Sequence, residues 1–370
     1  MKILQVIARV NRGGTARWIE ELITSLRSSG HEVLLVAGHV QAGETEDGAF
    51  EKLGGIRIEN MGRSVSLFSD LKSIIEVRKL IIKLKPDLIN THTAKAGLIG
   101  RLAAASILRN RPTIVHTYHG HLLYGYFPKW KSNILVLIEK FLASLSDVLI
   151  AAGDKVKSDL IEAGIGKENQ YFVARPGVEI LRLESREQIR LRMNFQEDQV
   201  IVGWLGRLAP IKRPDRVIEI AKVLNETIFL IGGDGELLSS LQRDLPKNVR
   251  LFGWTRPEEM WAVSDIALLT SDNEAQPISL IEASLAGLPV VAENVGSVSE
   301  VVNSEETGLL VSNHDERIQA LKRLLASPEI RKKMGASGEK YCAEKFGPKQ
   351  FLDSHLKAYG IAIKRHKSLN

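Results

Sequence analysis

Between residues 266 and 291 the chain passes from a strand through a polar loop and a short helix to a second strand, and no other stretch limits the fold more. The run from Ile266 to Leu269 is apolar enough for a buried strand, and Val290 to Ala292 has the same character. Gly287-Leu288-Pro289 ends the helix between them, because neither Gly nor Pro is a good helix residue. A strand, a helix and a strand in this order form a βαβ unit, whose strands lie parallel in one sheet.

The start of this helix has the features of an anion-binding site. Pro277 suits the first helical position, because its missing N–H would have no partner there in any case. The N–H groups that follow then point out of the helix, where they attract a phosphate. A capped helix without a ligand is the alternative. The N–H groups concerned are those of Ile278, Ser279 and Leu280.

Two carboxylates flank the helix start, Glu274 in the loop and Glu282 inside the helix. A carboxylate gains nothing from the charge of a nearby diphosphate, but it accepts hydrogen bonds from hydroxyl groups. A sugar nucleotide carries hydroxyls at both ends, on the sugar and on the ribose. The spacing therefore predicts a sugar-nucleotide site, and two solvated glutamates are the alternative.

Length and composition set the outer limits. With 370 residues, two domains are expected rather than one core. The single cysteine, Cys342, excludes an internal disulfide and indicates a reducing compartment. No signal peptide and no membrane span are predicted, so we expect a cytoplasmic protein. The net charge of +6 suits phosphorylated substrates, an anionic membrane surface or simply a basic enzyme.

The first βαβ unit tests whether the chain binds a dinucleotide. Lys2 to Val10 is a strand, Ala16 to Ser28 is a helix, and Gly13-Gly14 lies in the loop between them. A dinucleotide site needs G-x-G-x-x-G in this loop and an acid at the end of the second strand, and both are missing. An NAD(P) enzyme is therefore disfavoured. Gly13 and Gly14 let a ligand approach the backbone closely, or they form a plain tight turn.

Histidines gather where the strand from Thr113 to Thr117 ends, namely His116, His119 and His121. Open α/β sheets bind ligands at the carboxyl ends of their strands, so this group exceeds what a structural role requires. A metal site is the alternative, but no carboxylate or cysteine lies nearby in the sequence to complete it.

Aromatic residues and lysines alternate from Leu123 to Lys131, ahead of an apolar helix. This pattern suits a lipid headgroup region or an ordinary surface loop.

The second half of the chain repeats the α/β pattern after a turn at Arg175–Val178. Arg207 and Lys212 follow a strand, where two fixed cations can hold a diphosphate and stabilise the charge that grows on it as it leaves. Such a pair can take the place of a metal ion, and two surface cations are the alternative. Glu184 to Arg192 is predicted as a solvated helix, and the Lys364–Lys367 tail as disordered.

Taken together, these motifs resemble retaining glycosyltransferases of family 4. The segment from Glu274 to Glu282 resembles their E-x7-E motif, and Gly206 to Asp215 matches G-R-L-x-x-x-K-x-x-D. Thr91 to Gly97, with His119-Gly120-His121, resembles the branch of bacterial capsule, exopolysaccharide and O-antigen transferases. Ala275-Gln276 departs from the commonest form, which has Gly and a small residue before the proline. The donor sugar is therefore open.

The resemblance implies the GT-B fold, in which two facing Rossmann-like domains with parallel sheets place the active site in the cleft between them. The domains expected are 1–175 on the acceptor side and 176–345 on the nucleotide-sugar side, with a last helix in 346–370 that returns to the first domain. No metal cofactor is implied. The donor is a nucleoside-diphosphate sugar, with UDP as the default nucleotide. The acceptor is a glycan or a polyprenyl-diphosphate-linked sugar, with the enzyme peripheral on the inner face of the cell membrane.

The resemblance also assigns roles to residues. Arg207 and Lys212 hold the diphosphate together with the helix start, Glu282 binds the ribose, and Glu274 binds the sugar. His119 contacts the sugar near the reacting carbon. A sugar-nucleotide epimerase or a nucleotide-sugar-binding protein without turnover are the alternatives, whereas nucleic acid is not expected as a partner. Further residues expected near the ligands are Gly13, Gly14, Gly206, Gly232 and Leu251, the last beside the base.

Overall fold

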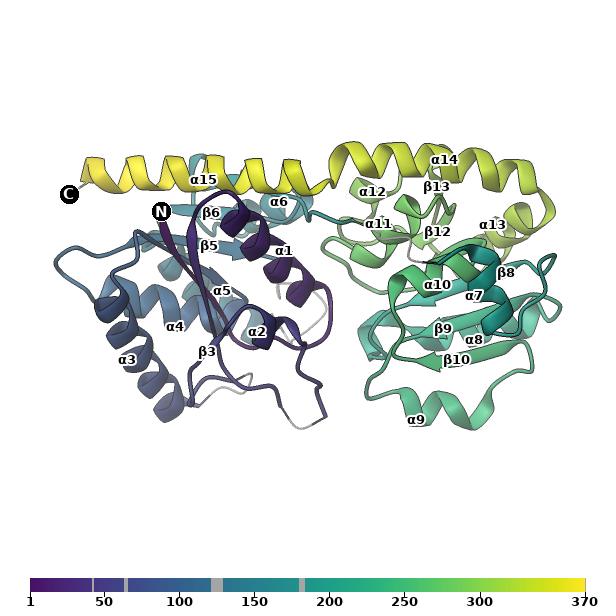
Figure 1. Ribbon diagram of the computed structural model, residues 1–370, viewed down its shortest axis with the longest axis horizontal. Coiled ribbons are helices and arrows are strands. Elements are labelled where there is room, and N and C mark those ends of the chain that lie inside the picture. The colour runs from purple at the N-terminus through teal and green to yellow at the C-terminus, as the bar shows by residue number, and fades with distance from the viewer. Residues whose placement is uncertain (42, 63–65, 121–128, 180–183, 370) are drawn as a thin grey trace. The chain divides into compact units, whose positions relative to one another are not determined.

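The computed structural model describes residues 1–41, 43–62, 66–120, 129–179 and 184–369 (Figure 1). The chain forms two compact units, each built on a parallel sheet. Unit 1 comprises Met1–Gly177 and Pro348–Asn370, and unit 2 comprises Val178–Gly347. The alternation of strands and helices read from the sequence predicts such sheets, because parallel neighbours need a crossover that usually contains a helix.

Unit 1 has a seven-stranded sheet in the order β3-β2-β1-β4-β5-β6-β7. Its strands are β1 (Lys2–Ile7), β2 (Glu32–Ala37), β3 (Ile56–Arg57), β4 (Leu88–His92), β5 (Thr113–Tyr118), β6 (Val148–Ala151) and β7 (Tyr171–Val173). Its helices are α1 (Gly14–Ser28), α2 (Ala49–Lys52), α3 (Leu67–Leu84), α4 (Ala94–Ala105), α5 (Lys129–Ser144), α6 (Asp154–Glu162) and α15 (Pro348–Leu369), with a short 3-10 helix η1 (Glu168–Gln170).

Both faces of the unit 1 sheet are covered, which explains why a central strand such as β6 is continuously apolar. In β1, Ile3 and Ile7 belong to the core that contains residues of α1 and α15, whereas Leu4 and Val6 belong to the core that contains residues of α3 and α4. Gln5 alternates with them and is fully buried. A polar side chain in such a position needs hydrogen-bond partners, and it finds them in α15 and β4.

Unit 2 has a six-stranded sheet in the order β10-β9-β8-β11-β12-β13. Its strands are β8 (Ile201–Leu205), β9 (Ile228–Gly232), β10 (Val249–Gly253), β11 (Ile266–Leu269), β12 (Val290–Glu293) and β13 (Gly308–Val311). Its helices are α7 (Arg186–Arg192), α8 (Pro214–Val223), α9 (Leu238–Leu241), α10 (Pro257–Val263), α11 (Ile278–Leu285), α12 (Val298–Val301), α13 (His314–Ala326) and α14 (Pro328–Lys345), with short 3-10 helices η2 (Pro210–Lys212) and η3 (Gln242–Asp244).

Two predictions about the edges of the units are wrong. The tail from Lys364 to Lys367 is not disordered, because α15 continues through it and Arg365 donates to the carbonyl of Asn169. The helix α7 is not simply solvated, because Arg190 is buried. Charge alone suggested an exposed segment in both places, but the carbonyl groups that bind these arginines lie elsewhere in the sequence.

The arginine of α7 is a structural centre of unit 2. Arg190 donates to the carbonyl groups of Gln196, Glu197 and Gln199 on one side. On the other side it donates to the carbonyl of Val263 and to the carboxylate of Asp265. A guanidinium with five donors can satisfy so many buried acceptors.

Among the helices that the structure describes, no candidate for a transmembrane segment is found.

Candidate active site

In unit 2, the predicted cation Lys212 and the predicted carboxylate Glu274 lie together. Lys212 Nζ donates to Oε1 of Glu274 at 2.6 Å, and the hydroxyl of Ser271 donates to the same oxygen at 2.7 Å. Glu274 is buried, with 8% of its surface exposed. No hydrogen-bond partner is found for the other carboxylate oxygen, Oε2, among the residues that the structure describes. That oxygen can therefore accept a hydrogen bond from a ligand hydroxyl.

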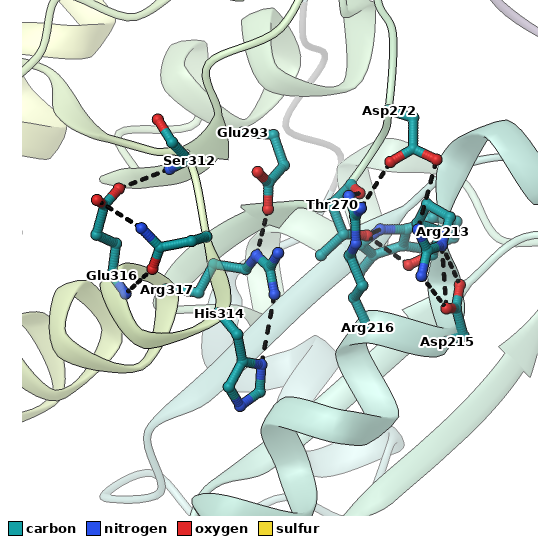
Figure 2. Close-up of polar contacts among 12 residues, drawn as sticks. Arg213, Asp215, Arg216, Thr270, Asp272, Glu293, Ser312, His314, Glu316 and Arg317 are labelled. Carbon is teal, nitrogen blue, oxygen red and sulfur yellow. Dashed lines mark hydrogen bonds and ion pairs between the residues drawn. The ribbon is translucent and has the colours of Figure 1, made fainter. Parts of the chain in front are cut away.

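The loop that carries Glu274 is fixed by two arginines of the neighbouring segment (Figure 2). Arg216, in α8, donates to the carbonyl of Thr270 at 2.8 Å and lies 2.7 Å from a carboxylate oxygen of Asp272. Arg213 bridges Asp215 and Asp272. The nearby pair of Arg317 and Glu293, also in Figure 2, is buried and joins α13 to the end of β12.

A glycine turn at Gly296 packs against the backbone of the same loop. Ser297 donates its N–H to the carbonyl of Glu274 at 2.9 Å. Gly296 has a φ of +54°, and a Cβ atom at this position would lie 1.8 Å from that carbonyl oxygen. Only glycine allows this approach of the two backbones. Gln276, which departs from the commonest family motif, donates to Glu300 at 3.2 Å, also beyond this turn.

Arg207 is placed differently from Lys212. Its side chain is exposed at the end of β8, and no ion pair or hydrogen bond is found for it within the described part of the chain. The loops after β8 and β9 are held side by side, because Gly206 donates to the carbonyl of Gly232 and Leu208 to that of Asp234. Arg207 is therefore an available cation on an anchored loop. Leu251 is half-buried in β10, next to β9.

The predicted helix start requires a correction. Pro277 is not the first helical residue but the cap before α11, with a ψ of 90° that is not helical. The N–H of Leu280 is not free, because it donates to the carbonyl of Pro277 at 2.9 Å. The outward N–H groups are thus those of Ile278 and Ser279, since no intramolecular acceptor is found for them within the described chain. Glu282 lies in α11 and is buried, with 3% exposed.

In unit 1, the residues predicted near the ligand follow the carboxyl ends of β1 and β5, which β4 separates in the sheet. Gly13 precedes α1 and Gly14 is its first residue, and both are exposed, whereas His119 follows β5, two strands away from β1 in the sheet. Trp18 of α1 packs edge-on against the ring of His119, with 4.7 Å between centroids. Gly13 has a φ of +146°, and a Cβ atom added to it would meet no atom within 4 Å, so the glycine loop is open on its outer side.

Of the histidines at the end of β5, His116 and His119 have separate partners. His116 is buried and lies 2.8 Å from the hydroxyl of Thr91, whereas His119 Nε2 lies 2.8 Å from Nδ1 of His92. His121 and the segment from Leu123 to Pro128 lie outside the described residues. Within the described ranges, no three side chains of the metal-binding types are placed to share an ion.

Burial governs the charge of these rings. It lowers the pKa of His119 to about 3, with a further contribution from His355, and it lowers the pKa of His92 well below the usual value. Both rings are therefore neutral at physiological pH. In unit 2, by contrast, Lys212 and Glu274 form an ion pair.

Sequence reasoning missed several residues that support the site. Ser271 and the turn at Gly296 position Glu274, while Trp18 and His92 position His119. His92 stood in the segment that carried the family resemblance, but nothing in its spacing pointed to His119. The signal for Gly296 was a glycine after a buried strand, which indicates a turn but not its partner.

Comparison with known families identifies the chain. Residues 12–180 match the family described as Glycosyltransferase Family 4, and residues 185–341 match Glycosyl transferases group 1. The chain belongs to glycosyltransferase family 4. The predicted family and the predicted enzyme class, a retaining glycosyltransferase, are confirmed.

Two bacterial glycosyltransferases are among the relatives of this chain. A UDP-Gal:alpha-D-GlcNAc-diphosphoundecaprenol alpha-1,3-galactosyltransferase of Escherichia coli is 28% identical over 295 residues, which cover 74% of this chain and 75% of the relative. The capsular polysaccharide biosynthesis glycosyltransferase CapM of Staphylococcus aureus is 26% identical, with 82% of this chain and 84% of CapM covered. Both are similar to this glycosyltransferase along most of their length.

Solved structures agree on the fold. HepE of Anabaena, determined in complex with UDP, superposes with a TM-score of 0.80 at 19% identity over 97% of this chain and 100% of HepE. Sucrose-phosphate synthase of Thermosynechococcus elongatus gives 0.83 at 18% identity, covering 97% and 98% of the two chains. The predicted GT-B fold with two parallel-sheet Rossmann-like domains is thus confirmed.

Proposed function

We propose that this glycosyltransferase moves a hexose-type sugar from a UDP-sugar to a hydroxyl of a polyprenyl-diphosphate-linked glycan during synthesis of a bacterial surface polysaccharide. The observation that carries the proposal is the Lys212–Glu274 pair, which places a cation and a half-satisfied carboxylate side by side. Support for the acceptor and the nucleotide comes from the Escherichia coli relative, whose name contains both a UDP-sugar and a diphosphoundecaprenol acceptor.

In this proposal each site residue has one task. Arg207 binds the diphosphate and stabilises the negative charge that develops on the leaving group. Lys212 contributes a second positive charge and orients Glu274 through their hydrogen bond. Oε2 of Glu274 accepts a hydrogen bond from a sugar hydroxyl, and Glu282 accepts those of the ribose.

Other residues complete the proposed donor site. The N–H groups of Ile278 and Ser279 face the phosphate, and His119 of unit 1 contacts the sugar. Gly13 and Gly14 let a substrate approach the backbone, and Gly206 and Gly232 do the same for the nucleotide. Leu251 lies beside the base.

Release of nucleoside diphosphate from a panel of UDP-, GDP- and ADP-sugars tests the proposal, with and without lipid-linked glycans extracted from a bacterium. Release from one UDP-sugar that rises with the extract is the expected result. Mass spectrometry of the donor distinguishes the alternatives, because an epimerase isomerises it and a binding protein returns it unchanged. Either of those results would contradict the proposal.

A membrane-facing surface on unit 1 fits a lipid-linked acceptor. Five apolar side chains of α5 are exposed at helical spacing, so that they share one face. The acid of this helix, Glu139, is bonded inward to Arg101, while Lys131 and Lys140 are exposed. An apolar face with lysines beside it suits an anionic bilayer surface. The five apolar residues are Trp130, Ile134, Leu137, Ile138 and Phe141.

The helix α3 has the same character. Leu71 and Ile75 are exposed, with Lys72 and Lys79 beside them, whereas Asp70 is buried against Lys95. We therefore propose that unit 1 rests on the inner face of the cell membrane, in the cytoplasm.

Sedimentation with vesicles tests the surface. Binding to vesicles with anionic lipids, but weakly to zwitterionic ones, is expected, and Leu137→Ser should reduce it several-fold. Leu191→Ser in α7 is the matched control, because Leu191 is also an exposed leucine of a helix, 82% exposed, but lies in unit 2. Equal binding by both variants would contradict the assignment of the surface.

A further inference from the structure

A chain of hydrogen-bonded side chains leads from the C-terminal helix to His119. Tyr359 of α15 accepts from Nε2 of Gln5 at 3.1 Å and from Nδ2 of Asn90 at 2.8 Å. Oε1 of Gln5 lies 2.7 Å from Nε2 of His92, and Nδ1 of His92 lies 2.8 Å from Nε2 of His119. All of these residues except His119 are fully buried. The proposed catalytic mechanism has no use for this chain.

The direction of each hydrogen bond follows from the orientation of the Gln5 amide, whose nitrogen faces Tyr359 and whose oxygen faces His92. The amide oxygen of Gln5 only accepts, so Nε2 of His92 must carry a hydrogen. His92 is fully buried and its ring bonds only to neutral groups among the residues described, which keeps it uncharged. A neutral imidazole with a hydrogen on Nε2 has none on Nδ1. Nδ1 of His92 therefore accepts, and Nε2 of His119 must donate to it.

The same step applies to the last ring. A neutral His119 that carries its hydrogen on Nε2 has a free electron pair on Nδ1. The ring is half-buried, and no hydrogen-bond partner of Nδ1 is found within the described part of the chain. Trp18 limits the rotation of the ring by packing edge-on against it. The one available polar atom of His119 is thus an acceptor in a fixed place.

We infer that Tyr359, Gln5 and His92 are positioning residues that hold His119 in the Nε2–H tautomer, so that its Nδ1 accepts a hydrogen bond from a hydroxyl of the donor sugar. The identity of the ligand rests on the proposed function, whereas the tautomer does not. An acceptor at this point selects a group that donates. A sugar with a carboxylate there would place two sets of lone pairs against each other and leave His119 unpaired.

The tautomer can be measured without any substrate. Nitrogen NMR of the intact enzyme with ¹⁵N-labelled histidine distinguishes a protonated ring nitrogen from a bare one, and a His119→Gln variant assigns the signals. We expect a hydrogen on Nε2 of His119 and none on Nδ1. A hydrogen on Nδ1, or a mixture of both forms, would overturn the inference whatever the activity of the enzyme.

Gln5→Glu tests the chain itself. A carboxylate beside His92 raises the pKa of that ring, and the imidazolium then donates from both nitrogens. His119 must in turn accept at Nε2 and carry its hydrogen on Nδ1. The expected result is a reversed tautomer of His119 and at least a tenfold loss of kcat/KM. An unchanged tautomer in this variant would contradict the inference.

Two tyrosine variants provide a matched pair that does not depend on a new charge. Tyr359→Phe removes the hydroxyl that orients Gln5, whereas Tyr171→Phe removes a buried hydroxyl that donates to the carbonyl of Ile165. We expect a mixture of His119 tautomers in the first variant and the pure Nε2–H form in the second. Identical spectra would overturn the role of Tyr359.

Activity then separates this inference from the proposed function. Deoxy analogues of the accepted donor should include one that the wild-type enzyme uses at least tenfold less well but that Gln5→Glu does not discriminate against. If the expected tautomer is found but no donor is turned over, the proposed function fails and the positioning chain stands. If donors are turned over with no such analogue, the contact between His119 and a sugar hydroxyl is wrong.

Discussion

The two units hold their candidate ligand-binding groups by opposite means. In unit 1 the groups behind His119 are uncharged and buried, and each is satisfied by the next. In unit 2 the groups around Glu274 are charged and are paired with cations at the surface, the side chain of Lys212 being 28% exposed. A charge can be kept there because a partner and water share its cost. Behind His119, where water is excluded, the groups are neutral and so avoid the cost of burying a charge.

The two arrangements nevertheless give one result. Glu274 has one oxygen engaged inside unit 2 and one that can receive a ligand, and His119 has its two ring nitrogens divided in the same way. Internal partners fix the orientation of each side chain, and the remaining atom is available to a ligand. Substitutions that affect charge, backbone or protonation should therefore act on the two units differently.

The largest effect is expected where a buried charge holds unit 2 together. Arg190→Ala removes one donor of the Asp265 carboxylate and the donors of several buried carbonyl groups, so the free energy of unfolding should fall by about 3–5 kcal/mol. Arg192→Ala in the same helix removes only exposed ion pairs and should cost about 1 kcal/mol or less. Urea denaturation measures both. If both variants lost a similar free energy of unfolding, the buried Arg190 would contribute no more to the stability of unit 2 than the exposed Arg192.

Removing the charge of Glu274 tests the ionic site directly. Glu274→Gln and Arg207→Ala should each lower kcat about 100-fold, or about 2.7 kcal/mol, because each removes electrostatic stabilisation of the transition state. Circular dichroism should stay unchanged. Lys222→Ala removes an exposed cation of α8 and serves as the control with full activity. Full activity of Glu274→Gln or Arg207→Ala with an intact fold would contradict the role assigned to that residue.

The next largest effect is expected where the backbone of Gly296 contacts the carbonyl of Glu274. Gly296→Ala forces a Cβ into the carbonyl of Glu274, so we expect about 1–3 kcal/mol of destabilisation and a loss of activity through the displaced loop. Gly287→Ala is the control, since its φ of +79° is also positive but only one atom lies within 4 Å of the added carbon. Thermal unfolding and donor turnover measure both effects. The idea fails if the control loses as much activity.

The smallest expected effect is a loss of stability in mild acid, which should differ between the two units. The folded pKa of His119 is lowered to about 3 and that of His355 to about 4, from 6.5, mainly by burial. Below pH 6.5 the unfolded chain therefore binds protons that folded unit 1 excludes, so stability falls as the pH is lowered toward the folded values. Each histidine contributes about 1.4 kcal/mol per pH unit over this window.

Hydrogen-exchange mass spectrometry in urea at pH 7 and pH 5 reports on both units at once. The groups that face His119 are His92 from β4, Trp18 from α1 and His355 from α15, and none of them carries a compensating negative charge. Unit 1 should lose stability over this range, whereas unit 2, with the single histidine His314, should change little. An equal loss in both units would remove the distinction drawn above.

The sequence predicted local structure well where periodicity and breakers agree. Ile266–Leu269 is a strand within the expected limits, because an apolar run ends at a polar loop. The start of α11 was misplaced by one residue, because Pro277 fits both the cap and the first helical position, and only the backbone angle separates the two. Predictions at such boundaries depend on a torsion that composition does not determine.

Contacts between distant residues account for what could not be predicted. Gln5 and Tyr359 are 354 positions apart, and their hydrogen bond depends on α15 packing against unit 1. Lys212 and Glu274 were both identified as site residues from motifs, but their direct pairing follows from the neighbouring positions of β8 and β11 in the sheet. Residue types with a chemical task can thus be found in a sequence, whereas the partners that hold them require the fold.

The helix α15 gives unit 1 an unusual order of assembly. A ribosome delivers the strands of unit 1 first, then the whole of unit 2, and only afterwards the helix that contributes Tyr359, Phe351 and Ala358 to the first core. Until that helix emerges, the nascent sheet has an uncovered apolar face and Gln5 lacks its acceptor. Unit 2 can therefore finish folding during translation, while unit 1 has to wait. His119 would acquire its final protonation pattern only after α15 has formed and packed.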